Sequence, residues 1–183
     1  MRLFIDKNNE KAITELYKRY ANRLLGYFFK MFNGDEQKAQ DFLQDLFVKV
    51  IEKKHQFDPS KKFYSWVFTI ASNMCMTSFR KPLLTEVGDS EMTLSKLGVS
   101  ADDELHRTQF RKMLRGAIHQ LEHHHKVVFI LRYQEQFSLK EIADISEASL
   151  GTVKSRLFYA TKKISEQLKD YAPENWDQLF KIS

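Results

Sequence analysis

The sequence predicts an all-α protein built from two small helical domains, and three observations support this prediction. The chain of 183 residues contains only 6 glycines and 3 prolines, which is too few for a turn-rich β-sandwich or barrel. Apolar residues recur every three or four positions over long stretches, as they do along amphipathic helices. A polar segment at residues 82–103 separates these stretches into two sets.

Three helices are expected before the polar segment. The first ends at the Asn33-Gly34 pair, which favours a left-handed turn. Asp35 can cap the second helix, whose apolar residues form a broad stripe. A loop follows at residues 54–62, and Pro82 closes a third helix that covers about residues 64–81.

The polar segment carries five acidic residues and one lysine, which is typical of a linker. Asp102 or Asp103 can cap the first helix after it, and a second helix follows. Ser138 has a glutamate three residues later, which is the spacing of a capping box and predicts a short third helix. A last helix covers about residues 150–170. The predicted units are residues 1–81 (N-terminal domain), 82–103 (acidic linker), 104–172 (C-terminal domain) and 173–183 (a tail).

Composition excludes several classes of protein. Cys75 is the only cysteine, so the chain forms no internal disulfide and no cysteine zinc cluster. The sequence has no apolar stretch of about 18 residues and no signal-peptide pattern, so we expect a cytoplasmic protein that is not inserted in a membrane. Glycine-rich phosphate loops and recognisable catalytic motifs are also lacking, so we expect neither an enzyme nor a cofactor.

A run of histidines, His123 to His125, follows His119 at one helical turn. Such a cluster can bind a metal, but no carboxylate or cysteine completes a typical ligand set. Capping of a helix end and weak pH sensing are the alternatives that we favour, and we predict no metal site.

The segment from Ser138 to Lys163 has the dimensions of a helix-turn-helix, in which the second helix enters the DNA major groove. If Val153, Leu157 and Ala160 are buried, a rotation of about 100° per residue turns a polar and basic face outward. Residues 150–163 hold four basic residues and no acid, which suits contacts with phosphates and base edges. An amphipathic helix with a solvated basic face is the alternative.

The third helix has a similar charge pattern but many more aromatic residues. Residues 61–81 hold four basic residues and no acid. The helical wheel places Trp66, Thr69, Asn73 and Arg80 on one face, away from the apolar residues. An aromatic ring beside polar side chains suits unpaired bases, because stacking contributes about 1–3 kcal/mol per base. The alternative is that Trp66 belongs to the core.

The second helix presents the opposite charge. Its outward face is acidic, with one apolar residue near the centre, so it meets either solvent or a protein partner rather than DNA. This face comprises Asp41, Gln44, Asp45, Val48 and Glu52.

Three separated motifs, in this order, resemble the extracytoplasmic function (ECF) sigma factors of bacterial RNA polymerase. The resemblance extends from about Ile13 to Leu168, which is nearly the whole chain. It implies that residues 1–81 correspond to sigma region 2 and that residues 104–170 correspond to region 4. The motifs are Ala39-Gln40-Asp41-Phe42-Leu43-Gln44-Asp45-Leu46-Phe47, Phe63-Tyr64-Ser65-Trp66 with Ile70-Ala71-Ser72-Asn73, and Leu150-Gly151-Thr152-Val153-Lys154-Ser155-Arg156-Leu157.

The resemblance also implies a role for each surface. It makes core RNA polymerase and promoter DNA the partners, with an anti-sigma factor as a further partner of many such proteins. The second helix is expected to dock on the polymerase, the third to open the −10 element and hold a flipped base, and the last to read the −35 element. The implied residues are Lys61, Lys62, Trp66, Thr69, Asn73 and Arg80 for −10 DNA; Thr152, Lys154, Ser155, Arg156, Tyr159 and Lys162 for −35 DNA; and Asp41, Gln44, Asp45 and Val48 for the polymerase.

One position departs from the family pattern. The turn before the last helix usually carries a glycine, whereas this chain has Glu147. A non-glycine residue at positive φ costs about 1 kcal/mol, so we expect a locally different turn. The tail after Pro173 lies outside the resemblance, and we expect it to pack back on one of the domains.

Two other classes of function stay open at this point. A DNA-binding regulator that acts without polymerase needs only the segment from Ser138 to Lys163, and it leaves the faces of the second and third helices unexplained. A metal-dependent hydrolase would need the histidine cluster as its metal site.

Overall fold

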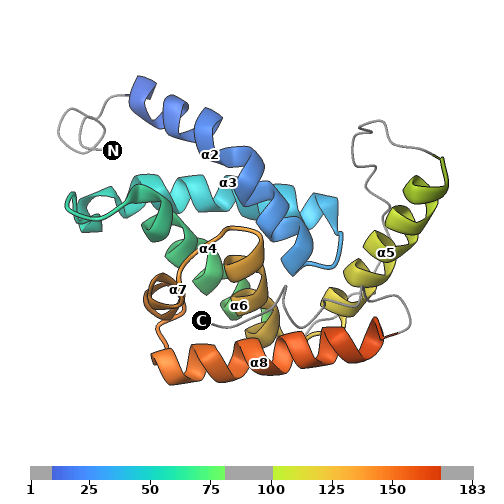
Figure 1. Cartoon of the computed structure of the whole chain (residues 1–183). Helices are drawn as coiled ribbons and strands as arrows, with labels where there is room; N and C mark the ends of the chain where they lie inside the picture. Colours follow the sequence, from blue (N-terminus) through green and yellow to red (C-terminus); the bar gives the residue numbers. More distant parts are fainter. Residues whose placement is uncertain (1–9, 81–100, 170–183) are drawn as a thin grey trace.

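The computed structural model describes residues 10–80 and 101–169, and every regular element in these two ranges is helical (Figure 1). The all-α prediction is therefore confirmed. The elements are α2 (Glu10–Met31), α3 (Glu36–Glu52), a short 3-10 helix η1 (Lys54–Gln56), α4 (Phe63–Arg80), α5 (Ala101–His119), α6 (His123–Tyr133), α7 (Leu139–Ile145) and α8 (Leu150–Gln167).

Local sequence signals end and begin these helices as expected. Asn33 and Gly34 follow α2 with φ values of 59° and 95°, which is the left-handed conformation of a helix C-terminus. The Asp35 carboxylate accepts a hydrogen bond of 2.9 Å from the Lys38 amide and caps α3. Ser138 and Glu141 form the predicted capping box of α7, and Ser149 caps α8.

The start of α5 differs from the sequence prediction. The helix begins at Ala101, so Asp102 and Asp103 lie inside its first turn rather than before it. Most of the predicted linker and the whole of the predicted tail lie outside the described residues.

One core cluster contains buried residues of both sets of helices, and a smaller one lies within the C-terminal set. In the N-terminal set, Leu24, Tyr27 and Phe28 of α2 are fully buried against α3 and α4. In the C-terminal set, the apolar stripe of α8 packs on α5, α6 and α7, as the periodicity predicts. The buried residues of that stripe are Val153, Leu157, Ala160 and Ile164.

The two sets also pack against each other, which the sequence did not predict. Phe137, in the segment between α6 and α7, lies against Tyr64 and Phe68 of α4, with ring centroids 4.9 Å and 5.3 Å apart. Figure 1 shows α6 and α7 between α4 and α8. Phe68 and Phe137 are both buried, so the apolar core continues from one set of helices into the other.

Two buried charged residues join the sets at either end of α6. Lys126 is 1% exposed, and its ammonium group donates to the Asn33 Oδ1 atom at 2.6 Å and to the His119 carbonyl at 3.2 Å. Burial lowers the Lys126 pKa to about 8. Glu135, also buried, accepts a hydrogen bond of 2.5 Å from the Tyr64 hydroxyl.

Within the two described ranges, no helix combines the length and hydrophobicity needed to cross a lipid bilayer.

Candidate nucleic-acid interface

A cavity of about 680 Å³ lies between α3 and α4. It has a mixed lining of aromatic, aliphatic, hydroxyl, amide and charged side chains, which suits a planar polar group such as a nucleobase. The lining residues are Phe42, Asp45, Lys49, Lys53, Gln56, Trp66, Thr69, Ile70, Asn73, Met74, Thr77, Ser78 and Glu147.

Trp66 belongs to both the core and this cavity. Its ring packs against Phe57 and Phe63, with centroids 5.2 Å and 5.9 Å away. The side chain is nevertheless only half-buried and lines the cavity. Trp66 can therefore be both a core residue and a surface for stacking, the two alternatives for this residue. Packing on one side fixes the orientation of the ring.

The structure brings together three of the six residues predicted to contact −10 DNA. Trp66, Thr69 and Asn73 line the cavity on successive turns of α4. Thr69 directs its hydroxyl to the Ser65 carbonyl at 3.2 Å. The three cations of this set, Lys61, Lys62 and Arg80, are exposed and do not line the cavity.

The predicted polymerase-binding face divides at Asp45. Val48, at the centre of this face, is 53% exposed, and Asp41 and Gln44 are exposed beside it. Asp45 is exposed as well but lines the cavity, so it lies at the border between the two surfaces.

Two cations that line the cavity were not predicted from the sequence. They are Lys49, in the last turn of α3, and Lys53, which directly follows the helix. They follow Asp45 at intervals of four residues, so the three side chains lie along one stripe of the helix. That spacing is visible in the sequence, but the contact between this stripe and α4 is not.

The C-terminal set contributes one residue to the cavity, Glu147 in the turn between α7 and α8. Its Oε1 atom accepts a hydrogen bond of 3.0 Å from the Asn73 amide. Glu147 has a φ of 48°, so the turn keeps a left-handed residue at this position even without glycine. The prediction of a locally different turn is therefore wrong.

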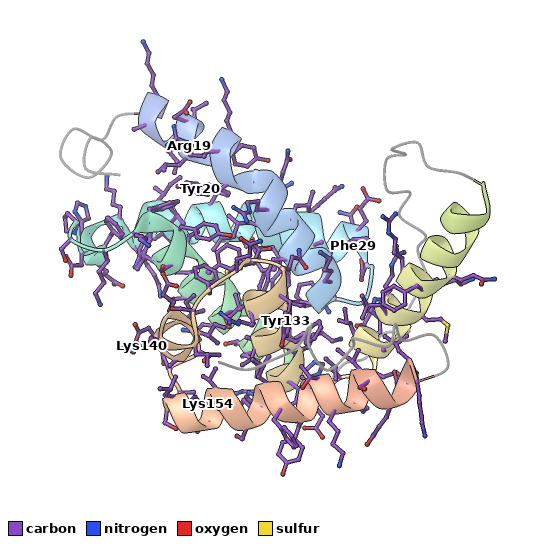
Figure 2. The ribbon with its side chains drawn as sticks, viewed as in Figure 1. Arg19, Tyr20, Phe29, Tyr133, Lys140 and Lys154 are labelled. Carbon is purple, nitrogen blue, oxygen red and sulfur yellow. The ribbon has the colours of Figure 1, made fainter. Side chains whose placement is uncertain are left out.

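The outward face of α8 agrees with the helical-wheel prediction. Lys154, Ser155, Tyr159 and Lys162 are exposed, and Thr152 and Arg156 are half-buried. Figure 2 places Lys154 on α8 and Lys140 on α7 at the same end of the molecule. Lys140, which sequence reasoning also missed, is exposed on the helix that crosses the DNA backbone in a helix-turn-helix.

The histidine run forms the first turn of α6. His123 stacks on Phe79 of α4, with centroids 3.6 Å apart. Burial and neighbouring cations lower the pKa values of His123 and His124. Within the described part of the chain, no three side chains of the metal-binding types gather into a candidate metal site.

A helix-turn-helix with a basic outward face, combined with a second helical unit, is the architecture of a DNA-binding protein. Comparison with known proteins specifies the family. Residues 16–82 match the model of sigma-70 region 2, and residues 111–164 match that of sigma-70 region 4.

Similar proteins cover almost the whole chain. The ECF sigma factor SigW of Bacillus subtilis is 26% identical over 91% of this chain and 94% of its own length. The ECF sigma factor RpoE of Cereibacter sphaeroides is 28% identical over 92% of each chain. This protein therefore belongs to the ECF sigma factors of the sigma-70 family, which are non-catalytic subunits of bacterial RNA polymerase that serve transcription initiation.

Two solved structures share the fold. The sigma factor RpoE of Bartonella quintana, solved with the anti-sigma factor NepR, superposes with a TM-score of 0.69 at 21% identity and covers 87% of this chain and 98% of its own. CnrH, solved with the cytosolic domain of CnrY, gives a TM-score of 0.66 at 23% identity and covers 92% of this chain and 94% of its own.

Proposed function

We propose that the two sets of helices divide promoter recognition between double-stranded and single-stranded DNA. The outward face of α8 binds the −35 element as a duplex, and the cavity between α3 and α4 holds an unpaired base of the −10 element. The exposed α3 face around Val48 docks on the core polymerase.

The observation that carries this proposal is the lining of the cavity. The fixed ring of Trp66 offers a stacking surface, and the Asn73 amide and Thr69 hydroxyl offer hydrogen bonds to a base edge. Lys49 and Lys53 add positive charge beside the cavity, which suits the phosphates of a single strand.

The α8 face favours a duplex for a different reason. It combines a long basic residue, Lys154, with the short side chain of Ser155 on a straight helix, and such a helix fits the major groove. Lys140 supports this role as a further phosphate contact from α7.

The polymerase contact is tested by mixing the purified protein with core RNA polymerase and measuring binding and run-off transcription. Val48→Arg replaces the apolar residue at the centre of this face with a charged one. It should weaken binding to the core polymerase at least tenfold, since truncating or charging an interface centre costs about 2 kcal/mol or more. Asn22→Arg on α2, which is also exposed, is the matched control. Unchanged binding of the Val48→Arg variant would remove α3 as the docking face.

The division of labour is tested on promoter DNA. Lys154→Ala should weaken duplex binding and reduce its salt dependence, because a phosphate contact is lost. Asn73→Ala should leave duplex binding unchanged and weaken binding to the single −10 strand. Equal effects of both variants on the duplex would contradict the proposal. An anti-sigma partner stays a prediction.

A further inference from the structure

The turn between α7 and α8 extends from the helix-turn-helix to the cavity on α4. Glu147 in this turn lines the cavity together with Trp66, and its carboxylate accepts the hydrogen bond from Asn73. A residue of the proposed duplex-binding unit therefore occupies the proposed single-strand site.

Glu147 makes this contact from a strained backbone. Its φ of 48° costs a residue with a Cβ atom about 1 kcal/mol relative to glycine. The amides of Glu147 and Ala148 still bond to the carbonyls of Asp144 and Ala143, as they do at an ordinary helix C-terminus. The turn itself would therefore be better served by glycine, and only the glutamate side chain provides the contact with Asn73.

The neighbouring interface holds Glu147 at the cavity. Phe137 packs on Tyr64 and Phe68 of α4, and the Lys62 ammonium lies 3.7 Å from the Glu141 carboxylate. These contacts position α7 along α4, so the turn that follows α7 lies against the cavity in the packed arrangement.

From this geometry we propose that Glu147 is an autoinhibitory contact. This inference rests on the proposed role of the cavity in holding an unpaired base. The carboxylate accepts the same Asn73 hydrogen bond that a base carbonyl would accept, and its negative charge repels the phosphates of an entering strand. Lys49 and Lys53 line the same cavity, as does the acidic Asp45.

The contact makes strand capture depend on domain movement. The outward face of α8 points away from its buried stripe and stays exposed in the packed arrangement, so duplex binding needs no rearrangement. A single strand enters the cavity only after the turn with Glu147 leaves Asn73. Duplex recognition therefore precedes strand capture in the free protein.

The test measures the affinity of the full-length protein for a fluorescent thymidine oligonucleotide, a sequence-tolerant probe of base stacking. Glu147→Gly removes the carboxylate and suits the left-handed backbone, so the affinity should rise about twofold to tenfold, as expected when a competing hydrogen bond is removed. Glu147→Gln keeps an acceptor without the charge and should give a smaller rise. Asp144→Asn, three residues earlier and also exposed, is the control for net charge.

The outcomes separate the two proposals. A rise for Glu147→Gly with no change for Asp144→Asn supports the contact, provided that thermal unfolding shows both variants folded. If the affinity rises equally for both variants, the change in net charge alone explains the effect, and the inference is overturned. If Asn73→Ala weakens oligonucleotide binding but Glu147→Gly leaves it unchanged, the autoinhibitory contact fails while the binding site stands. If neither change affects binding, the site itself is wrong.

Discussion

The faces of α4 and α8 have the same charge pattern in the sequence but different surroundings in the structure. Residues 61–81 and residues 150–163 each carry four cations and no acid. The outward face of α8 is exposed. Contacts with the C-terminal set begin at Lys62, just before α4, and continue along the helix at Tyr64, Phe68, Asn73 and Phe79.

The difference follows from the aromatic content of the two helices. An aromatic surface that stacks on bases also packs well against other aromatic side chains, and α4 has Tyr64 and Phe68 where Phe137 approaches. The outward face of α8 carries only Phe158 and Tyr159 as aromatic residues, and both stay exposed in the packed arrangement. The surface that is suited to an unpaired strand is therefore also the surface through which the two sets of helices meet.

The largest expected effect comes from Phe137→Ala, which removes the apolar centre of this interface. Phe137 is 3% exposed, and truncation of a buried phenylalanine costs about 3–5 kcal/mol. Phe137 belongs to a core cluster that contains residues of both sets, so its truncation weakens the coupling between them, and the two sets of helices should then unfold in separate transitions. Urea unfolding followed by Trp66 fluorescence in a Trp176→Phe background, and by circular dichroism, would resolve them.

Leu157→Ala is the matched variant for this experiment. Leu157 is fully buried on α8, and its truncation costs a similar free energy within the C-terminal set. If Phe137→Ala leaves a single transition, the two sets still unfold together without Phe137, and the aromatic contact with α4 is not what couples them.

The separate helices could be predicted from the sequence because local signals determine them. Asp35 and Ser138 cap helices with their own side chains, and apolar spacing identifies the buried stripe of α8. The packing of the two sets could not be predicted, because Phe137 lies in a short connection where no periodicity indicates which partner buries it. Lys126 was also unexpected inside the protein, since lysine is seldom buried and its partner Asn33 is distant in the sequence.

The candidate site was predictable to a similar extent. Trp66 and Asn73 share a face of one helix, so helical spacing is enough to group them. Lys49 and Lys53 line the same cavity from α3, and that grouping depends on how two helices cross. Glu147 stood out in the sequence only as a departure from glycine, and its contact with Asn73 depends on the packing of the two sets.

A smaller effect is expected at the other end of the interface, where Lys126 joins α6 to Asn33. Burial lowers the Lys126 pKa to about 8, against an ordinary value of 10.5. Between these two pH values the unfolded chain binds more protons than the folded one, so this residue makes stability rise with pH. Its destabilising contribution is complete below about pH 8 and disappears toward pH 10.5.

Lys126→Met removes this titration. We compare the free energy of unfolding of the wild-type protein with that of the variant. The wild-type value minus the variant value should rise by about 1 kcal/mol per pH unit between about pH 8 and pH 10.5 and stay constant below pH 8. The exposed Lys18 on α2, changed to methionine, is the control for the loss of a surface lysine. A flat difference for Lys126→Met would mean that the ammonium group is solvated and that this end of the interface is open.

The smallest effect is expected for Lys62→Ala. This variant separates the two roles of the α4 surface, which are packing against the C-terminal set and binding of a single DNA strand. The Lys62 side chain is 80% exposed, and its 3.7 Å pair with Glu141 is worth at most about 1 kcal/mol. Loss of the pair should therefore change domain packing only slightly. Loss of a phosphate contact should lower the salt slope of single-strand binding by about 0.7, measured with the thymidine oligonucleotide at several salt concentrations.

Lys61→Ala provides the comparison, because Lys61 is a neighbouring exposed cation. If both residues act only on DNA, the two variants should lose the same affinity and the same salt slope. If the Lys62–Glu141 pair holds α7 over the cavity, Lys62→Ala should lose less affinity than Lys61→Ala, because easier opening offsets the lost phosphate contact. A larger loss for Lys62→Ala would contradict that offset and would make Lys62 a DNA contact alone.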